Sequence, residues 1–422
     1  PPPQLVANCT GDAVVAHVMP FTLQNIRSEN WRLREAATMA FCCILDGPTP
    51  EAIGNYVAQS VPVFVSALKD PQPIVKDTTA WTISRMCELH ASSIPMEQYG
   101  GLLSGVTEPL LTESPTIAAH CCMSIFHLAI HFDSQDQPTS ALSAHMRNLI
   151  QLLLQVTDRE DWNEGNLRLT AYDAISMLIQ HAALDSEPLF AELTPAILQK
   201  LADCMAMPVV SEDDKMAKEN LQISLCSIIL VLVRALSEEH LGQYADSIMM
   251  GTITIFETKN LALYQDAFLV TGAVADRLES RFERYQEKVH PAIVLGLKNR
   301  EAYTVCNAAV CTLGDMCRAL EGRIFKNCDE LMMALLENLQ DTSLNRSVKP
   351  TVLSCFGDIA LALNGNFEKY VQVTLTMLSQ ASQTRAADED EDSIEYLNTL
   401  RVGILEAYVG IVQGLKADNK QD

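Results

Sequence analysis

The sequence is poor in aromatic residues, which make up 6% of its 422 positions, and signals for β-strands are nearly absent. Ala, Leu, Ile, Val and Met dominate instead, as suits helices that pack closely on one another. No GxxxxGK[ST], dinucleotide GxGxxG or GxSxG motif occurs, so we expect no enzyme activity and no cofactor. No signal peptide and no apolar run long enough to span a bilayer are evident, and we expect no membrane insertion.

Patterns for metal sites and disulfides are also missing. The thirteen cysteines include no CxxC pair, and Cys42 and Cys121 each begin an adjacent pair inside an apolar helical stretch. His127 and His131 are the only histidines four residues apart, and no HExxH glutamate stands between them. We therefore predict no metal site and interpret the cysteines as small buried hydrophobic residues in a reducing compartment.

Positive charge is scarce. The chain has 30 Lys and Arg against 53 Asp and Glu, which gives a formal net charge of -23. Such a field repels nucleic acid and anionic membrane surfaces and favours a basic partner. The alternative is that the acidity only keeps a long, exposed molecule soluble.

What the chain does contain is a repeated unit of two helices. A proline inside an apolar helix recurs at Pro20, Pro62 and Pro291. Eight residues after each comes a small polar residue, namely Ser28, Asp70 and Asn299. One helical hairpin cannot bury its own apolar stripe, so such units must stack. A period of about 47 residues fits HEAT or armadillo repeats better than tetratricopeptide or ankyrin repeats. We predict an all-α, HEAT-repeat, right-handed superhelical solenoid.

No linker divides the chain, and we predict a single continuous solenoid over residues 1–422. Its nine hairpins are expected at about 1–47, 48–92, 93–134, 135–184, 185–237, 238–282, 283–321, 322–365 and 366–422. Neither end carries an evident polar capping repeat, so we expect further repeats in a larger cytosolic or nuclear protein.

Local signals give further expectations about the turns. Asp70 has a side chain suited to cap the helix that follows it, and Pro71 suits a first helical turn. Polar connections are expected at 158–165 and 211–214. The acidic run 388–392 is expected to be a solvated, disordered insertion rather than a site.

The second helices of the hairpins line up on their turns. This alignment makes Met39, Trp81 and Met123 equivalent, 42 residues apart each time. An exposed Trp81 could stack on a lysine or arginine of a ligand, or it could instead pack into the core between repeats. Four residues on, the same face carries Arg85, Asp315 and Asp358, and seven residues on it carries Asp46, Glu88, Asp276 and Arg318.

A ladder of carboxylates beside an aromatic side chain suits a basic helix or extended segment. The alternative is a solvated charged face in which the arginines neutralise some acids in place. We predict that a basic ligand is bound by six residues, and we predict no catalytic residue. The six are Trp81, Asp77, Glu88, Asp276, Asp315 and Asp358.

Five stretches resemble one family, the importin-β (karyopherin-β) nuclear transport receptors. They are 30–41 (NWRLREAATMAF), 76–85 (KDTTAWTISR), 346–350 (RSVKP), 357–362 (GDIALA) and 406–416 (EAYVGIVQGLK). The likeness runs in order over essentially the whole chain. It implies a middle to C-terminal fragment, which lacks the N-terminal repeats that supply the principal Ran contacts.

The resemblance implies a monomeric HEAT superhelix that wraps the basic importin-β-binding segment of an importin-α adaptor, or a basic cargo, on an acidic concave surface. Ran-GTP would release that ligand in the whole protein, and phenylalanine-glycine nucleoporins would bind the outer face. The implied location is the cytoplasm, the nucleus and the pore complexes of the nuclear envelope. Trp81 matches a family tryptophan that holds the basic helix, whereas Met123 replaces another and offers no cation–π face.

The alternative from a different class is a structural HEAT scaffold, similar to the regulatory subunit of a phosphatase. Such a scaffold would hold folded partners at a fixed separation. Its binding would require little basic charge and would depend weakly on salt.

Overall fold

The computed structural model describes residues 8–385 and 391–417, and all regular elements in these ranges are helices. No strand occurs there. The chain divides into two compact units, residues 1–192 and 193–422, and the division falls within α10 (Glu187–Ala206). The predicted single continuous solenoid and its right-handed superhelix both depend on how these two units join. Both therefore stay predictions.

In the first unit α-helices follow one another in packed pairs. The pairs are α2 (Ala13–Asn25) with α3 (Trp31–Cys43), α4 (Pro50–Ala67) with α5 (Pro73–His90), α6 (Tyr99–Thr107) with α7 (Pro115–His131), and α8 (Ser143–Thr157) with α9 (Leu167–Gln180). Short 3-10 helices join them, namely η1 (Ala91–Ser93), η2 (Met96–Gln98), η3 (Glu108–Leu111) and η4 (Leu184–Ser186).

The second unit continues with α11 (Glu212–Ala235) and four further pairs. They are α12 (Glu238–Glu257) with α13 (Tyr264–Leu278), α14 (Glu283–Leu297) with α15 (Tyr303–Leu320), α16 (Cys328–Gln340) with α17 (Val348–Leu363), and α18 (Glu368–Ser382) with α19 (Glu391–Ala417). Its 3-10 helices are η5 (Leu261–Leu263), η6 (Glu279–Phe282), η7 (Glu321–Asn327) and η8 (Asn364–Phe367).

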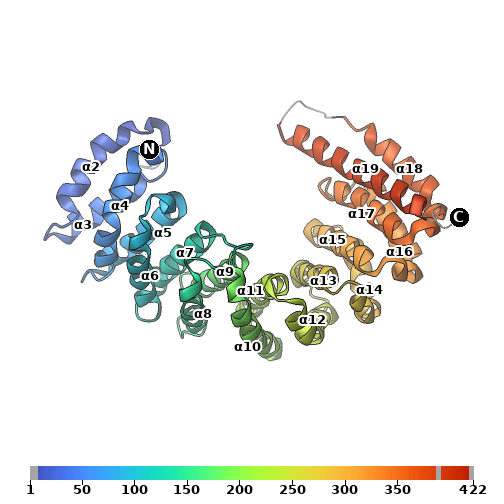
Figure 1. Cartoon of the computed structure of the whole chain (residues 1–422), viewed down its shortest axis with the longest axis horizontal. Coiled ribbons are helices and arrows are strands. Elements are labelled where there is room, and N and C mark those ends of the chain that lie inside the picture. Colours follow the sequence, from blue (N-terminus) through green and yellow to red (C-terminus); the bar gives the residue numbers. More distant parts are fainter. Residues whose placement is uncertain (1–7, 386–390, 418–422) are drawn as a thin grey trace. The chain divides into compact units, whose positions relative to one another are not determined.

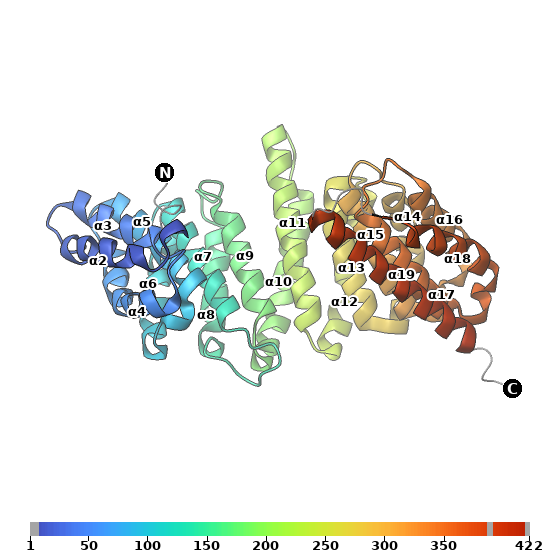
Figure 2. The same ribbon diagram turned by 90° about the horizontal axis from the view of Figure 1, so that it is seen from above.

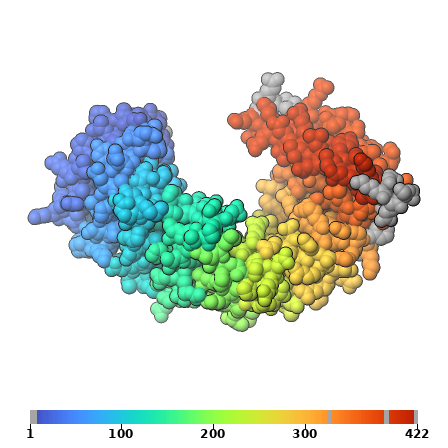
Figure 3. Space-filling model, in the orientation of Figure 1, coloured from blue at the N-terminus to red at the C-terminus, as the bar shows by residue number. Residues whose placement is uncertain are grey.

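Within each unit the second helices of successive pairs pack against one another. In the first unit these are α3, α5, α7 and α9, and in the second they are α11, α13, α15, α17 and α19 (Figure 1, Figure 2). In the space-filling view, colours that follow the sequence do not interleave inside either unit (Figure 3). Each pair therefore buries its apolar stripe against its sequence neighbours, as a helical repeat requires.

The prolines predicted inside helices lie there: Pro20 in α2, Pro62 in α4 and Pro291 in α14. The predicted cap of the second hairpin is wrong, however. Helix α5 begins at Pro73 rather than at Pro71, and its N-cap residue is Gln72. Since Asp70 lies two residues further from the helix, it cannot occupy the capping position.

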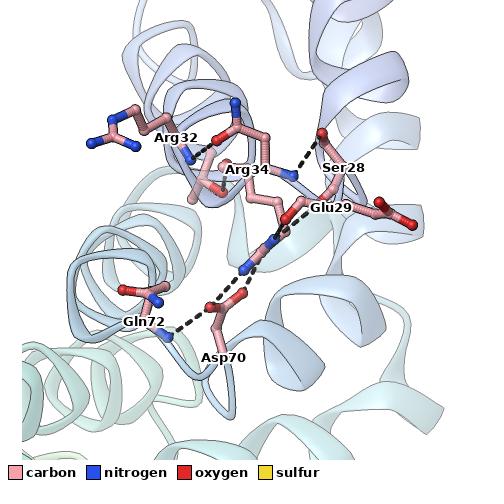
Figure 4. Close-up of polar contacts among 8 residues, drawn as sticks. Ser28, Glu29, Arg32, Arg34, Asp70 and Gln72 are labelled. Atoms are coloured by element: carbon pink, nitrogen blue, oxygen red, sulfur yellow. Dashed lines mark hydrogen bonds and ion pairs between the residues drawn. The ribbon is translucent and has the colours of Figure 1, made fainter.

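The Asp70 carboxylate joins two hairpins instead (Figure 4). Its Oδ1 accepts a hydrogen bond from the backbone N–H of Gln72 at 2.9 Å. Its two oxygens also bind Arg34 of α3, with Oδ2 2.7 Å from Nε and Oδ1 2.9 Å from Nη2. Arg34 Nη1 donates to the Ser28 carbonyl at 2.8 Å, so a single guanidinium fixes the turns of both hairpins.

Ion pairs of this kind recur between neighbouring hairpins. Lys76 Nζ lies 2.6 Å from Glu113 of the next hairpin, and Arg300 Nε lies 2.7 Å from Asp341. These side chains are mostly buried, so each pair is screened less by salt than an exposed pair. The hairpins are therefore held in register by polar contacts as well as by their apolar faces.

Two predicted connections differ from the structure. Ser211 and Asp214 form a capping box that begins α11, so this polar stretch is a helix start rather than a long loop. Residues 388–390 of the acidic run lie outside the described residues, whereas Glu391 and Asp392 form the first turn of α19.

The 24-residue helix α11 corrects the expectation that no apolar run could span a bilayer. By length and composition alone it passes that test, and half of its most apolar stretch is buried inside the protein. Core helices of soluble proteins pass the same test. The long apolar stretch is therefore weak evidence for a membrane span.

The cysteines are free thiols, and most are buried as predicted. Burial raises the pKa of Cys42 and of Cys87 to about 12, which keeps these thiols protonated and unreactive at neutral pH. Cys9 and Cys311 are exposed, so the prediction of buried cysteines is wrong for these two. Cys311 occupies the position on α15 that Trp81 occupies on α5, which places it on a surface row rather than in the core.

We predict that Asp70→Asn lowers the free energy of unfolding of the first unit by about 2 kcal/mol at neutral pH. The substitution leaves the mostly buried guanidinium of Arg34 without its counter-charge. All three tryptophans lie within residues 1–192, so tryptophan fluorescence in a urea titration reports on this unit.

The difference between wild type and Asp70→Asn should disappear in acid. Burial opposes ionisation of Asp70, but the hydrogen bonds from Arg34 and Gln72 outweigh it, so the pKa of Asp70 is lowered. The contribution of Asp70 to the free energy of unfolding is thus complete above the pKa of about 3.9 in the unfolded chain. It is lost as the pH falls through the lower pKa of the folded protein. As a matched control, Arg147→Gln removes an exposed pair with Glu192 and should leave the urea midpoint nearly unchanged. Equal midpoints for Asp70→Asn and wild type at pH 7 would contradict the prediction.

Candidate functional site

The six predicted ligand residues fall into two sets, one in each unit. Helix α5 carries the first set, which consists of Asp77, Trp81 and Glu88. The second set consists of Asp276 on α13, Asp315 on α15 and Asp358 on α17. That both sets serve one ligand stays a prediction.

Trp81 is half-buried, so it is neither a core residue nor fully exposed. Met39 on α3 and Met123 on α7 take the equivalent places and are also half-buried. Among the residues that the structure describes, no guanidinium or ammonium group lies over the Trp81 ring, although Arg32 lies over Trp31. Its open part is accordingly available for stacking with a cation from a partner.

Asp77 lies one helical turn before Trp81 on α5. Its Oδ1 atom is buried and has no hydrogen-bond partner within residues 8–385 and 391–417. His120 of α7 is near enough to interact with it: burial lowers the pKa of His120, and the charge of Asp77 opposes that shift. Without a donor on this oxygen, the negative charge of Asp77 is little compensated inside the chain, so the position favours a cation placed nearby.

Glu88 is already paired. Its Oε2 accepts from Arg85 Nη1 at 2.6 Å and lies 3.9 Å from His127 Nε2. Arg85 Nη2 is also 3.9 Å from Asp46, at the end of the preceding second helix. Burial lowers the pKa of His127 while Glu88 opposes the shift. Around Glu88, acidic and basic side chains therefore alternate along the row of second helices. This arrangement favours the alternative interpretation, in which arginines neutralise the acids in place.

The second set is likewise built around an arginine. Arg318 Nη2 lies 2.5 Å from Asp315 Oδ1, and Nη1 lies 2.8 Å from Asp358 Oδ2. Burial raises the pKa of Asp315; Arg318 opposes this and Asp276 adds to it. Asp276 is exposed. Two of these three acids pair with Arg318, so the row keeps an excess of negative charge.

Glycines on the neighbouring helices make room for these carboxylates. The Asp315 carboxylate occupies the space that a Cβ on Gly272 would fill, and Asp358 Oδ2 is 2.6 Å from the same point on Gly314. Sequence reasoning missed this role. The signal was present, because Gly272, Gly314 and Gly357 stand 42 and 43 residues apart at one position of three successive second helices.

The chemistry of both sets is that of cation binding. In the described part of the chain, no group of three or more His, Cys, Asp or Glu residues is placed to hold a metal ion. Carboxylates fixed on rigid helices beside a half-open indole can bind guanidinium or ammonium groups.

Two family models match the chain. Residues 102–422 match the model described as Importin subunit beta-1-like, TPR repeats, and residues 31–86 match a HEAT-like repeat. Among curated relatives, Importin subunit beta-1 of Arabidopsis thaliana is 36% identical over 99% of this chain and 49% of its own length. Importin subunit beta-1 of Schizosaccharomyces pombe is 35% identical over the same shares. The chain thus spans about half the length of the curated relatives it matches.

Solved structures agree with these matches. A crystal structure of importin beta in an ammonium sulfate condition has a TM-score of 0.92 and 31% identity, covering 99% of this chain and 49% of that one. A Kap95:Nup1 complex has a TM-score of 0.86 and 27% identity, covering 98% and 48%. A third solved structure has a TM-score of 0.77, 27% identity and the same coverage. It is described as showing that Kap95p binding induces the switch loops of RanGDP to adopt the GTP-bound conformation.

The HEAT-like match and the importin-beta structures confirm the predicted all-α HEAT-repeat fold. They also favour the transport-receptor interpretation over a phosphatase-type scaffold. A family model that matches residues 102–422 covers most of the sequence. The chain belongs to the importin subunit beta-1 family of nuclear transport receptors.

Proposed function

We propose that this chain binds a basic segment, either that of an importin-α adaptor or a basic cargo, on the face of its second helices. The observation that carries the proposal is the grouping on α5 of a half-open Trp81 with the unpartnered carboxylate oxygen of Asp77. An arginine or lysine placed there would stack on the ring and be attracted by the charge of the Asp77 carboxylate. In the second unit, Asp276 with the Asp315 and Asp358 that pair with Arg318 would offer a second acidic surface.

The partners of the wider family belong to the same proposal. Named neighbours include a Kap95 complex with Nup1 and a Kap95p structure concerning RanGDP. We infer that phenylalanine-glycine nucleoporins contact this chain, and that Ran-GTP promotes release in the whole protein, mainly through repeats outside the chain. The proposed location is therefore the cytoplasm, the nucleus and the pores of the nuclear envelope.

The proposed mechanism is binding and release, without catalysis. Each hairpin contacts only its neighbours, so small rotations between hairpins can add up to a change in pitch. A ligand that prefers one pitch then opposes a ligand that prefers another, by a coupling free energy that is equal in both directions.

The affinity of the whole chain for a synthetic basic importin-β-binding peptide, titrated across salt, tests this function. We expect saturable binding at low salt that weakens about ten-fold by physiological ionic strength, because charge attraction brings the peptide to the acidic face. Fluorescence anisotropy of a labelled peptide measures it. A scrambled peptide of the same composition controls for net charge alone. Absence of binding at low salt, or binding that salt does not change, would favour the scaffold alternative.

Replacing Trp81 by alanine should weaken peptide binding about five-fold, since one cation–π contact contributes about 1 kcal/mol. Trp31→Ala is the matched control: it removes a half-buried indole from α3, outside the row of equivalent positions. Circular dichroism melting should show that both variants stay folded. If Trp81→Ala binds as tightly as wild type, Trp81 is no part of the site.

A groove between the first helices α4 and α6 favours the nucleoporin contact. It has a volume of about 440 Å³, and its apolar lining includes Val61, Pro62 and Val65 of α4 with Gly101 and Leu102 of α6. This volume lies in the range that holds small ligands, and the lining suits the aromatic side chain of a phenylalanine-glycine repeat.

Gly101→Leu should fill this groove and reduce binding of a phenylalanine-glycine peptide by about ten-fold or more, because the new side chain takes the place of the ligand's ring. A Cβ at Gly101 meets no atom within 4 Å, so the helix tolerates the change. Gly100 has the same open space but does not line the groove, which makes Gly100→Leu the matched control. Equal losses in both variants, measured by titration calorimetry, would exclude the groove.

A further inference from the structure

Two arginines line a groove in the second unit, which we call the arginine groove. It lies near the starts of the neighbouring first helices α12 and α14 and has a volume of about 390 Å³ (Figure 1). Its lining consists of Gly242 of α12, Leu278 of α13, Arg281 of η6 and Arg284 of α14. Among the described residues that line it, the charged ones are both arginines. The groove is therefore basic, although the chain has a net charge of -23.

Arg281 is only weakly compensated by its contacts inside the chain. Its Nη2 lies 3.8 Å from the carboxylate of Glu238, which is too long for a hydrogen bond. Its Nε donates to the carbonyl of Leu278 at 3.4 Å, which is also long. Neither contact is a short, charge-assisted hydrogen bond, so an anion in the groove could form stronger bonds with this guanidinium.

Arg284 is held in place by a ring and shares its acid. Its guanidinium carbon lies 4.8 Å from the centroid of the Tyr285 ring, and its Nη2 lies 3.2 Å from Asp246 Oδ1. The Tyr285 hydroxyl donates to the same oxygen at 2.5 Å. The side chains of Asp246 and Glu238 are 71% and 80% exposed, so these two acids are well solvated and their ion pairs contribute little.

Gly242 and Leu278 shape the remainder of the groove. A Cβ on Gly242 would lie 3.8 Å from Arg281 Nη1, so the absence of a side chain at this position leaves space in front of the guanidinium. Leu278 is buried and supplies an apolar wall. An acidic side chain that reached the two guanidinium groups could therefore pack its aliphatic part against Leu278.

We propose that the arginine groove binds an anionic side chain, a carboxylate or a phosphorylated serine, from an acidic segment of a protein partner. Arg281 and Arg284 would each direct N–H donors at its oxygens, since guanidinium groups match the geometry of carboxylate and phosphate. The net charge of the chain opposes such a ligand at long range. At physiological ionic strength this repulsion is screened beyond about 8 Å, whereas the arginines act at contact distance.

This site is separate from the surface proposed for a basic segment. It is built from the starts of first helices and a 3-10 helix rather than from the row of second helices, and it takes a ligand of the opposite charge. Its test therefore uses acidic probes. The two sources of an anionic side chain are represented by an oligo-glutamate peptide and by a peptide of equal length that contains phosphoserine.

Fluorescence anisotropy of each labelled peptide measures binding to the whole chain at physiological ionic strength. Arg281→Gln should weaken binding about five-fold, and adding Arg284→Gln should weaken it ten-fold or more, because charge-assisted hydrogen bonds are lost. The phosphoserine peptide should bind more tightly, since phosphate carries more charge and three acceptor oxygens. Arg401→Gln is the matched control: it removes one positive charge from an exposed position of α19 outside the groove and should change binding less than two-fold.

A second pair of variants leaves both arginines in place. Gly242→Asp adds a carboxylate beside Arg281 and should reduce binding of both peptides ten-fold or more, because the new acid competes with the ligand. In Gly242→Ala the new Cβ lies at an ordinary contact distance from Arg281 and adds no charge. This variant should bind within two-fold of wild type.

Losses in Arg281→Gln and Gly242→Asp, together with nearly unchanged binding in their two controls, support the arginine groove, and the tighter peptide identifies the anionic group. Failure of wild type to bind either peptide, or equal losses in Arg281→Gln and Arg401→Gln, overturns it. If circular dichroism shows that Arg281→Gln is unfolded, the two Gly242 variants decide. All variants should bind the basic importin-β-binding peptide within two-fold of wild type, so failure of this proposal is distinguishable from failure of the proposed function.

Discussion

The contact between successive second helices is the constraint on which the other features depend. A pair of helices leaves one apolar face uncovered, and the second helix of the next pair covers it. Between α17 and α19 the backbones touch at Gly357 and Gly410, where a side chain on either residue would collide with the opposite main chain. Because this packing fixes the register of the helices, it also fixes which polar side chains meet across the boundary. The rows of acids exist only as a result of that register.

The helix pairs could be predicted because their signals are local. Prolines within apolar stretches and polar residues eight positions later mark the first helix and its turn, and Pro62 lies inside α4 as predicted. The role of Asp70 could not be predicted in this way. Its partner Arg34 is 36 residues earlier, and only the stacking of two hairpins brings the charges together. Short patterns favoured a cap because they contain no information on distant neighbours.

For the candidate surface, helical spacing predicts that Asp315 and Asp358 share a face with the Trp81 position, and in the structure Arg318 joins these two acids. The spacing did not show which carboxylate would pair with which arginine, since that depends on side-chain conformations and on the neighbouring helix. Sequence also gave no hint that Glu279 and Glu321 take positive φ values at the ends of α13 and α15, because glutamate seldom adopts this conformation. These turns are imposed by the packing of the repeat rather than by local preference.

Because arginines lie among the acids, charge would act differently on the association rate and on the dissociation rate of a partner. At distances beyond about 8 Å, internal ion pairs such as those of Arg318 act as dipoles, and a partner senses mainly the net charge of -23. That long-range field would govern how often the proposed basic partner arrives. At contact distance a partner of the proposed kind would meet individual carboxylates, and these contacts would govern how long it stays. Surface charge can therefore change the association rate of this protein while the dissociation rate, set at individual carboxylates, remains the same.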